Sequence, residues 1–167
     1  MDNDGSDWRE AVRSHRSEKA ATYASREETP LGDAVFADFD GLEFYPVDET
    51  VRVSGRLETV ANPEPVSLAA SRGPPMSFER VGQLGVTVDG EFAVLETFRA
   101  PGVEALLVPF RDRTNGSETW AKGRYLTIPG PDGEESAEVL EVTVDFNLAY
   151  HPLCVYDPSV RSVLPPE

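Results

Sequence analysis

Three arginines and two acidic residues flank a short turn between apolar segments in residues 108–126 (VPFRDRTNGSETWAKGRYL). Arg111 and Arg124 carry planar guanidinium groups, which suit a carboxylate or a phosphate. Asp112 and Glu118 could orient these arginines or bind a cation. The same pattern also fits a surface hairpin in which the acids pair with the arginines, because structural ion-pair networks resemble sites in sequence. The residue types alone favour the surface network.

The C-terminal segment, residues 145–167, holds a second set of polar and reactive side chains. His151 and Cys154 could form a base and nucleophile pair, because a thiolate needs a base or a positive neighbour. Asp145 could join them around a metal ion, although H-x-x-C lacks a fourth ligand. Alternatively, Asp145 and Asn147 bond backbone amides while Cys154 packs as a small apolar residue. We favour packing, since free cysteine is among the most buried residue types, and His151 is then incidental.

Strands must position both segments. Residues 51–60 (VRVSGRLETV) alternate apolar and polar side chains, which is typical of a half-buried strand. Asp89-Gly90 is the strongest short hairpin signal in the chain, and a Pro/Gly/Asp loop is expected at 129–136. The pattern predicts a mainly β protein, either an antiparallel sandwich or a partly open barrel. The other expected strand segments are 66–71, 83–98, 104–110, 123–128 and 137–146.

One N-terminal α-helix is expected before the strands, over residues 6–25, with its regular part starting near Asp7. Trp8, Val12 and Tyr23 recur at helical spacing, so they could share one face. We expect this face to pack on the body of the domain.

The length of 167 residues fits one domain. We expect residues 1–5 to be frayed, and residues 35–167 to form a β domain with an irregular C-terminal tail. The sequence carries no signal for a particular oligomeric state.

Charge is the strongest compositional signal. The chain has 30 acidic and 15 basic residues, a formal charge of −15, and only Lys19 and Lys122 are lysines. Such a carboxylate surface fits concentrated salt, where the Debye length falls to about 3 Å at 1 M. We therefore expect a halophilic, cytoplasmic protein, with an acidic mesophilic protein as the alternative. The charge argues against nucleic acid and anionic membranes as partners.

No apolar run approaches the roughly 18 residues of a membrane helix. The N-terminus lacks the basic-then-apolar layout of a secretory signal, and no Gly-rich phosphate loop is present. We expect no cofactor and no bound metal ion.

Three motifs give the chain a family resemblance. They are PFRD-x-T-x-G-x-ET at 109–119, GRYL at 123–126 and DFN-x-AY-x-P-x-C at 145–154. On these motifs the chain resembles the family catalogued as domain of unknown function 1684, in a haloarchaeal-type form. The resemblance implies no activity. It carries the family motif onto Phe110, Arg111, Asp112, Thr114, Gly116, Glu118, Thr119, Gly123, Arg124, Tyr125, Asp145, Phe146, Asn147, Ala149, Tyr150, Pro152 and Cys154.

Two positions depart from the pattern that the resemblance implies. His151 stands where relatives are expected to have asparagine, which weakens the Cys–His hypothesis. Ser162 stands where relatives tend to have a second cysteine, eight residues after Cys154. A two-cysteine metal or redox role is therefore not expected here.

The leading hypothesis is a small-molecule-binding or scaffold module with a polar cluster, and the arginines favour an anionic ligand. The cluster would form if the two motif segments lie on neighbouring strands. One alternative is an enzyme, such as a hydrolase, with Asp145 or Glu118 as general base and an arginine as electrostatic stabiliser. Another is a purely structural or interaction protein. The candidate ligand-binding residues are Arg111, Asp112, Glu118, Arg124, Tyr125, Asp145, Asn147 and Tyr150.

Overall fold

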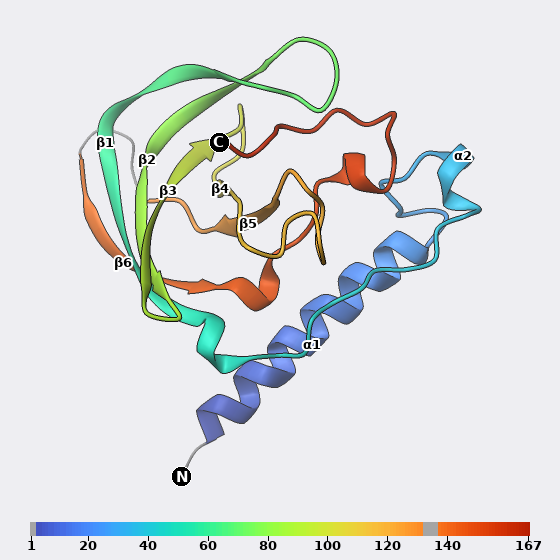
Figure 1. Cartoon of the computed structure of the whole chain (residues 1–167), viewed down its shortest axis with the longest axis horizontal. Helices are drawn as coiled ribbons and strands as arrows, with labels where there is room; N and C mark the ends of the chain where they lie inside the picture. Colours follow the sequence, from blue (N-terminus) through green and yellow to red (C-terminus); the bar gives the residue numbers. More distant parts are fainter. Residues whose placement is uncertain (1–2, 132–136) are drawn as a thin grey trace.

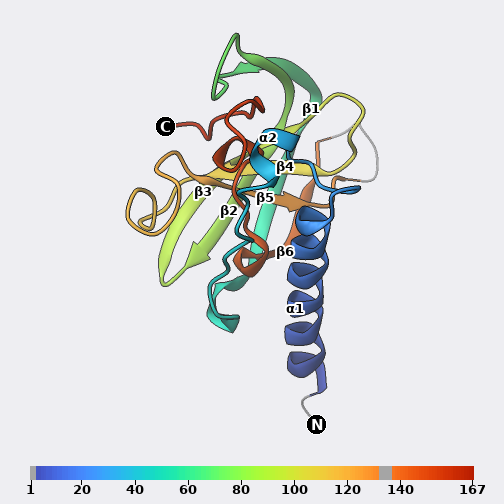
Figure 2. The ribbon, with the colours of Figure 1, turned by 90° about the vertical axis from the view of Figure 1, so that its right-hand side faces the viewer.

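The computed structural model describes residues 3–131 and 137–167, and a six-stranded antiparallel sheet forms its body. The strands follow the order β5-β4-β3-β2-β1-β6, and the sheet curls into a half-barrel (Figures 1 and 2). This confirms the predicted mainly β fold in its partly open barrel form. The strands are β1 (Arg52–Leu68), β2 (Met76–Val88), β3 (Glu91–Arg99), β4 (Leu106–Phe110), β5 (Arg124–Ile128) and β6 (Val139–Asp145).

The long helix α1 (Asn3–Ala24) lies along the open side of the curled sheet (Figure 2). Its start precedes the predicted one, so residues 3–5 are helical rather than frayed. Val12 and Tyr23 are buried and Trp8 is half-buried, as their spacing predicted. No helix among the described residues is long and apolar enough to cross a membrane. The short helices are α2 (Asp33–Phe36), η1 (Glu49–Val51), η2 (Phe146–Leu148) and η3 (Leu153–Val155).

Local features give the sheet its hairpin and its curl. Asp89 and Gly90 form the β2–β3 turn with φ angles of 51° and 77°, and positive φ at both positions is what a tight two-residue hairpin requires. Register shifts in β1 and β2 bend the strands. At Gly82 a β-carbon would lie 2.1 Å from the Glu58 carbonyl oxygen, so the two strands can approach this closely only with glycine there.

The main core fills the concave side of the sheet. Leu57 in β1 faces Leu84 in β2 on one side and Leu140 in β6 on the other. Burying each such leucine contributes about 1.5–3 kcal/mol. Since strands from both halves of the sheet supply these side chains, the core stabilises the curl itself. The buried members are Leu57, Val81, Leu84, Val86, Leu106, Val108, Phe110, Leu126, Ile128 and Val144.

The irregular C-terminal tail returns to the sheet. Val163 forms an antiparallel bridge with Ala70, and its carbonyl accepts a hydrogen bond from the Tyr125 hydroxyl. Cys154 is half-buried, and its backbone N–H donates to the Ser162 hydroxyl at 3.2 Å. Ser162, which stands where relatives are expected to have a second cysteine, is therefore adjacent to Cys154.

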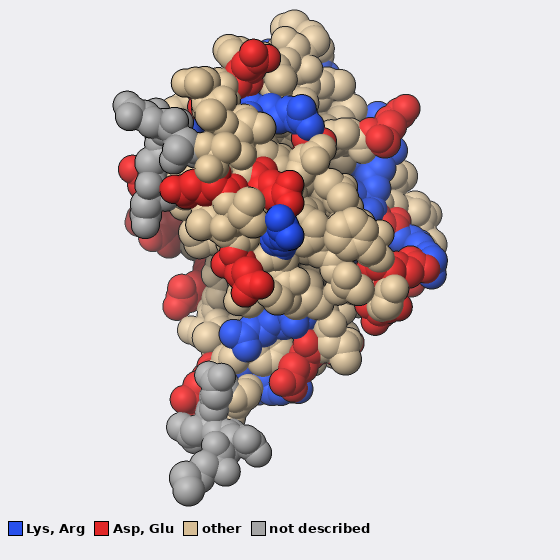
Figure 3. Space-filling view, turned by 90° about the vertical axis from the view of Figure 1, so that its left-hand side faces the viewer, with Lys and Arg blue, Asp and Glu red and all other residues tan. Residues whose placement is uncertain are grey.

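The face formed around β1 and β6 carries charges of both signs. Figure 3 shows acidic and basic side chains interspersed among uncharged ones on this side. On the strands, Arg56 pairs with Glu58 at 3.0 Å and Arg80 pairs with Glu96 at 2.5 Å. Because acids accompany these arginines, neither pair presents an unopposed positive charge.

Candidate functional site

A pocket of about 1340 Å³ lies between α1, the segment 40–48, the concave side of β2 and β3, and the connection between β4 and β5. Small-molecule sites usually measure roughly 300–1,000 Å³, so this pocket has room for a ligand together with water. Aromatic and aliphatic side chains form much of its wall. The charged side chains among them are Arg16, Lys19, Asp40, Glu43, Asp48, Asp89, Glu91, Arg111, Asp112, Arg113, Glu118 and Arg124.

An ion pair in the pocket joins β5 to the segment that follows β4. Arg124 Nη2 lies 2.7 Å from Asp112 Oδ2, and the Arg124 side chain is only 12% exposed. The guanidinium carbon lies 5.7 Å from the Tyr45 ring centroid and 5.4 Å from the Phe110 ring centroid. Arg124 Nε is buried and has no hydrogen-bond partner among the described residues. This donor is enclosed by protein atoms.

Asp112 is held as a carboxylate by its own loop as well as by Arg124. Its Oδ1 accepts hydrogen bonds from the Thr114 hydroxyl and, at 2.8 Å, from the Thr114 backbone N–H. Burial alone would raise the pKa of Asp112, but hydrogen bonds from Thr114 and Arg124 outweigh it and hold the pKa below its usual value. The pair is therefore ionised at neutral pH.

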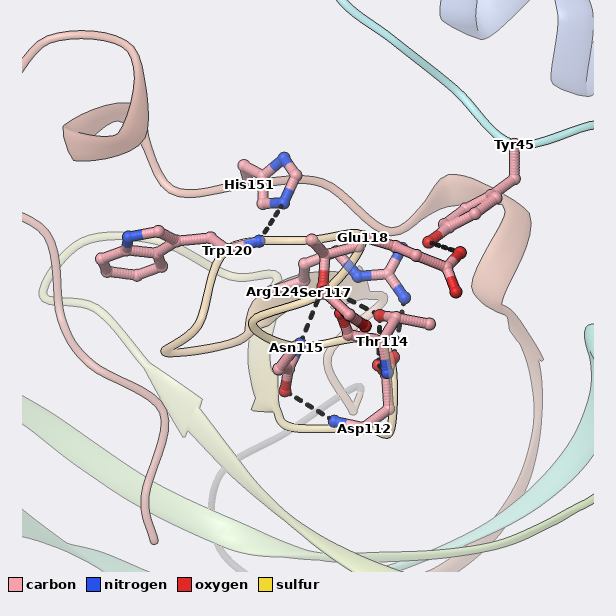
Figure 4. Close-up of polar contacts among 10 residues, drawn as sticks. Tyr45, Asp112, Thr114, Asn115, Ser117, Glu118, Trp120, Arg124 and His151 are labelled. Carbon is pink, nitrogen blue, oxygen red and sulfur yellow. Dashed lines mark hydrogen bonds and ion pairs between the residues drawn. The ribbon is translucent and has the colours of Figure 1, made fainter.

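The remaining motif residues of this loop mainly shape it. Asn115 Oδ1 accepts from the Asp112 backbone N–H at 2.8 Å, and Asn115 Nδ2 donates to the Thr119 hydroxyl at 2.9 Å (Figure 4). Gly123 has φ 109°, and a β-carbon there would lie 2.4 Å from the Phe110 carbonyl oxygen. These contacts explain why a motif of small polar residues and glycines is needed to present Asp112.

The rim of the pocket is more exposed. The Tyr45 hydroxyl donates to Glu118 Oε2 at 2.9 Å (Figure 4). Burial, and then the bond to Glu118, raise the pKa of the Tyr45 phenol. Arg111 lies at the pocket edge, and its guanidinium donates to the Pro165 carbonyl at 3.3 Å. Arg111 thus holds the C-terminal tail and does not join the Arg124 pair.

His151 has a defined position, contrary to our expectation that it is incidental. Its Nε2 accepts a hydrogen bond from the Trp120 backbone N–H at 3.1 Å (Figure 4), and the ring lines the pocket. Burial lowers the pKa of His151, and the positive charges of Arg124 and Lys19 lower it further. His151 is therefore a neutral imidazole that anchors the loop through Nε2.

Asp145 and Asn147 do not join the arginines, so the single predicted cluster is not formed. Asp145 Oδ2 accepts from the Trp8 indole N–H at 2.7 Å, and Oδ1 accepts from the Asn147 side chain at 2.7 Å. Asn147 is buried and exchanges two further hydrogen bonds with the Asp48 backbone, at 2.8 and 2.7 Å. These two residues tie β6 to α1 and to the segment before β1.

The two candidate tyrosines separate in the same way. Tyr125 is buried under the tail, and it does not line the pocket. Tyr150 does line it, packs edge-on against Tyr125 at 5.7 Å between centroids, and shares a 2.7 Å hydrogen bond with the Thr127 hydroxyl. Of these two tyrosines, only Tyr150 is thus part of the pocket wall.

Two cations that we did not predict as site residues project from α1 into the pocket. Lys19 Nζ lies 3.8 Å from the Tyr150 ring centroid. Arg16 donates to the carbonyls of Tyr45, at 2.6 Å, and Asn147, at 2.9 Å. Neither cation makes an ion pair with a described residue. Burial lowers the pKa of Lys19 to about 8. The near absence of lysine elsewhere was the one signal that could have singled out Lys19.

The arrangement narrows the set of residues that could act as a general base or hold a metal ion in the pocket. Asp145 is engaged by Trp8 and lies outside the pocket lining, which removes it as a general base there. Glu118 is at the exposed rim. Within residues 3–131 and 137–167, no group of three His, Cys, Asp or Glu side chains could hold a metal ion. Seven carboxylates and five cations line the pocket. Among the cations, Arg124 is paired with Asp112, whereas Lys19 and Arg16 have no ion pair with a described residue.

The fold and the pocket together define a class of small, mainly β protein, in which an N-terminal helix crosses the open side of a curled half-barrel. The family described as "Protein of unknown function (DUF1684)" matches residues 37–167. The chain belongs to this family. The match begins after α1, so it does not include Arg16 or Lys19.

A solved structure supports the assignment over a longer range. The solution NMR structure of an uncharacterised protein from Haloarcula marismortui is 32% identical to the chain, with a TM-score of 0.73. The similarity covers 100% of this chain and 90% of that one, so it includes the region of α1. No curated protein matches the chain.

Proposed function

We propose that this protein binds a small anionic molecule in the pocket, with Lys19, Arg16 and Arg124 as its cationic contacts. The observation that carries the proposal is the state of the two α1 cations. In a chain of formal charge −15, Lys19 and Arg16 line the pocket without an ion-pair partner among the described residues. A half-buried cation is destabilised unless it is neutralised, and a bound carboxylate or phosphate would neutralise it.

The walls indicate a ligand with an apolar part as well. Phe44, Tyr45 and Phe110 stand near the arginines, and Tyr150 lies beneath Lys19. The Arg124 guanidinium, which pairs with Asp112, lies beside the Tyr45 ring. A pocket that combines aromatic walls with a few polar groups is typical of small-molecule sites.

Thermal unfolding with a panel of anions tests this function. Inorganic phosphate, succinate, benzoate and a nucleoside monophosphate are the probes, with benzamide as an uncharged comparison. At a hundred times its Kd, a ligand stabilises the fold by about 2.7 kcal/mol, which raises Tm by several degrees. We expect at least one anion to do so.

The two lysines provide a matched pair of variants. Lys19→Gln should weaken binding at least tenfold, about 1.4 kcal/mol, whereas Lys122→Gln, on an exposed loop, should leave it unchanged. The proposal fails if no anion raises Tm, or if both variants respond like the parent protein.

We further propose that the protein works in a salt-rich cytoplasm as a single domain. The supporting features are the charge of −15 with two lysines among 15 basic residues, and a similar protein in Haloarcula marismortui. Screening by salt lowers self-repulsion among carboxylates. We therefore expect one cooperative unfolding transition whose Tm rises between 0.1 and 3 M KCl, and a flat or falling Tm would contradict this. The same charge makes nucleic acid and anionic membranes unsuitable partners.

A further inference from the structure

Lys19 differs chemically from the other cations of the pocket. The chain has 15 basic residues and only two are lysine, yet one of them lies in the pocket, 3.8 Å from the Tyr150 ring centroid. A guanidinium stays protonated in proteins, whereas a lysine amine can lose its proton and become a nucleophile. An anion contact alone would be served equally well by arginine, which this chain uses almost everywhere else.

The surroundings of Lys19 favour the neutral amine. Burial lowers the pKa of Lys19 to about 8, so about a tenth of the side chain is unprotonated at pH 7, roughly 300-fold more than for an unperturbed lysine. No carboxylate of the described residues pairs with it to hold the ammonium form. The Tyr150 ring face favours the ammonium, whereas burial favours the neutral amine. Desolvation of this kind is a recognised way to activate a lysine nucleophile.

The pocket also holds groups that would orient an anionic electrophile. Arg124 presents its guanidinium beside Tyr45 and has a buried Nε without a partner in the described chain. Arg124 and Lys19 both lower the pKa of His151, so both charges lie near one imidazole. His151 itself is neutral, and its Nε2 is engaged by the Trp120 backbone N–H. Lys19 and Arg124 therefore serve one region of the pocket.

We infer that Lys19 forms a reversible imine with an aldehyde or ketone that carries a carboxylate or phosphate, and that Arg124 binds the anionic group. This inference rests on the proposed anion-binding function and names the class of ligand. The Nζ lone pair attacks the carbonyl carbon, and one amine hydrogen is transferred to the carbonyl oxygen to give a carbinolamine. The hydroxyl then leaves with the second amine hydrogen as water, and a C=N bond remains. No oxidant or reductant is needed.

Reductive trapping of the full-length protein tests the inference. The protein is incubated with glyoxylate, succinic semialdehyde or pyridoxal phosphate, reduced with borohydride, and analysed by intact mass and peptide mapping. Propionaldehyde is the uncharged control. With at least one anionic probe we expect Lys19 to be labelled at least tenfold more than Lys122, and propionaldehyde to show no such preference. Less than tenfold preference with every anionic probe overturns the inference.

A competition experiment gives the same answer without a variant that might fold poorly. An excess of an unreactive anion that raises Tm should protect Lys19 but not Lys122 from labelling, and absence of protection counts against the inference. Lys19→Arg should lose the adduct, whereas Lys122→Arg should keep the adduct. If anions raise Tm but no adduct forms, imine formation is wrong and anion binding stands. If neither occurs, both proposals fail.

Discussion

Replacing Lys19 by methionine should stabilise the protein. The substitution keeps an unbranched side chain of similar length on α1 and removes a half-buried charge that has no ion-pair partner among the described residues. A thioether beside the Tyr150 ring also makes a favourable contact. We expect the free energy of unfolding to rise at pH 7, because replacing a functional residue that destabilises the fold often increases stability.

The magnitude follows from the pKa of Lys19. A fall from 10.5 to about 8 corresponds to at most about 3.5 kcal/mol, at about 1.4 kcal/mol per pKa unit. The ammonium is still partly hydrated, so solvent screening reduces this figure, and we expect a gain of about 1 kcal/mol. Since the folded-state pKa lies below the unfolded one, the charge penalty is complete below pH 8 and disappears as the pH rises towards 10.5. The gain at pH 9.5 should therefore be about half of that at pH 7.

Urea denaturation of the parent protein and the Lys19→Met variant, from pH 6.5 to 9.5, measures both effects. Taking the difference between the two proteins cancels the titration of all other groups. Lys122→Met is the control, and it should change the free energy of unfolding by less than about 0.5 kcal/mol at every pH. A loss of stability in Lys19→Met at pH 7, or a gain that does not shrink with pH, would refute the reasoning.

Three further predictions test the scaffold of the pocket by chemical denaturation. Asp112→Asn should cost about 2 kcal/mol at pH 7, because it leaves the nearly buried Arg124 without its carboxylate. Because the folded-state pKa of Asp112 is low, this stabilisation is complete above pH 3.8 and is lost in stronger acid. The free energies of unfolding of the two proteins should therefore converge at low pH. A difference that stays constant with pH would contradict the ion pair. Asn147→Ala removes three hydrogen bonds of a buried side chain and should cost about 3 kcal/mol. Amide hydrogen exchange in α1 should become faster. Unchanged exchange would show that Asn147 does not hold the helix. Gly123→Ala should cost more than about 2 kcal/mol, since its β-carbon would lie 2.4 Å from a carbonyl oxygen. Gly90→Ala should cost only about 1 kcal/mol, because Gly90 has φ 77° but lies in open space. Equal losses in the two glycine variants would contradict the steric argument.

Features set by neighbouring residues could be predicted from the sequence. The Asp89-Gly90 hairpin depends on two backbone angles, and the strand segments depend on a period of two. The inner face of α1 followed from the spacing of Val12 and Tyr23. For the same reason the motif around Asp112 was recognisable, because Thr114 and Asn115 close its turn within a few residues. In all of these, the determining interactions lie within one element or one turn.

The composition of the pocket depended on contacts between distant segments. The two motif segments adjoin β5 and β6, which lie at opposite edges of the sheet, so Asp145 at the end of β6 does not meet the Arg124 pair. The chain then returns, and Tyr150 bridges to Tyr125 in β5, which brings the next residue, His151, to the loop after β4. Strand order is a global property, and residue types within one segment do not encode it.

The sequence by itself determined a mainly β fold with one amphipathic helix, an acidic surface poor in lysine, and the loop that holds Asp112. Only the tertiary structure decided that α1 crosses the open side of the half-barrel and directs Arg16 and Lys19 into the pocket. The physical reason is that a helix can dock on a curled sheet in several positions and orientations that bury the same apolar stripe. The packed core and the hydrogen bonds of Asp145 and Asn147 select one of them, and that selection places Lys19 over Tyr150.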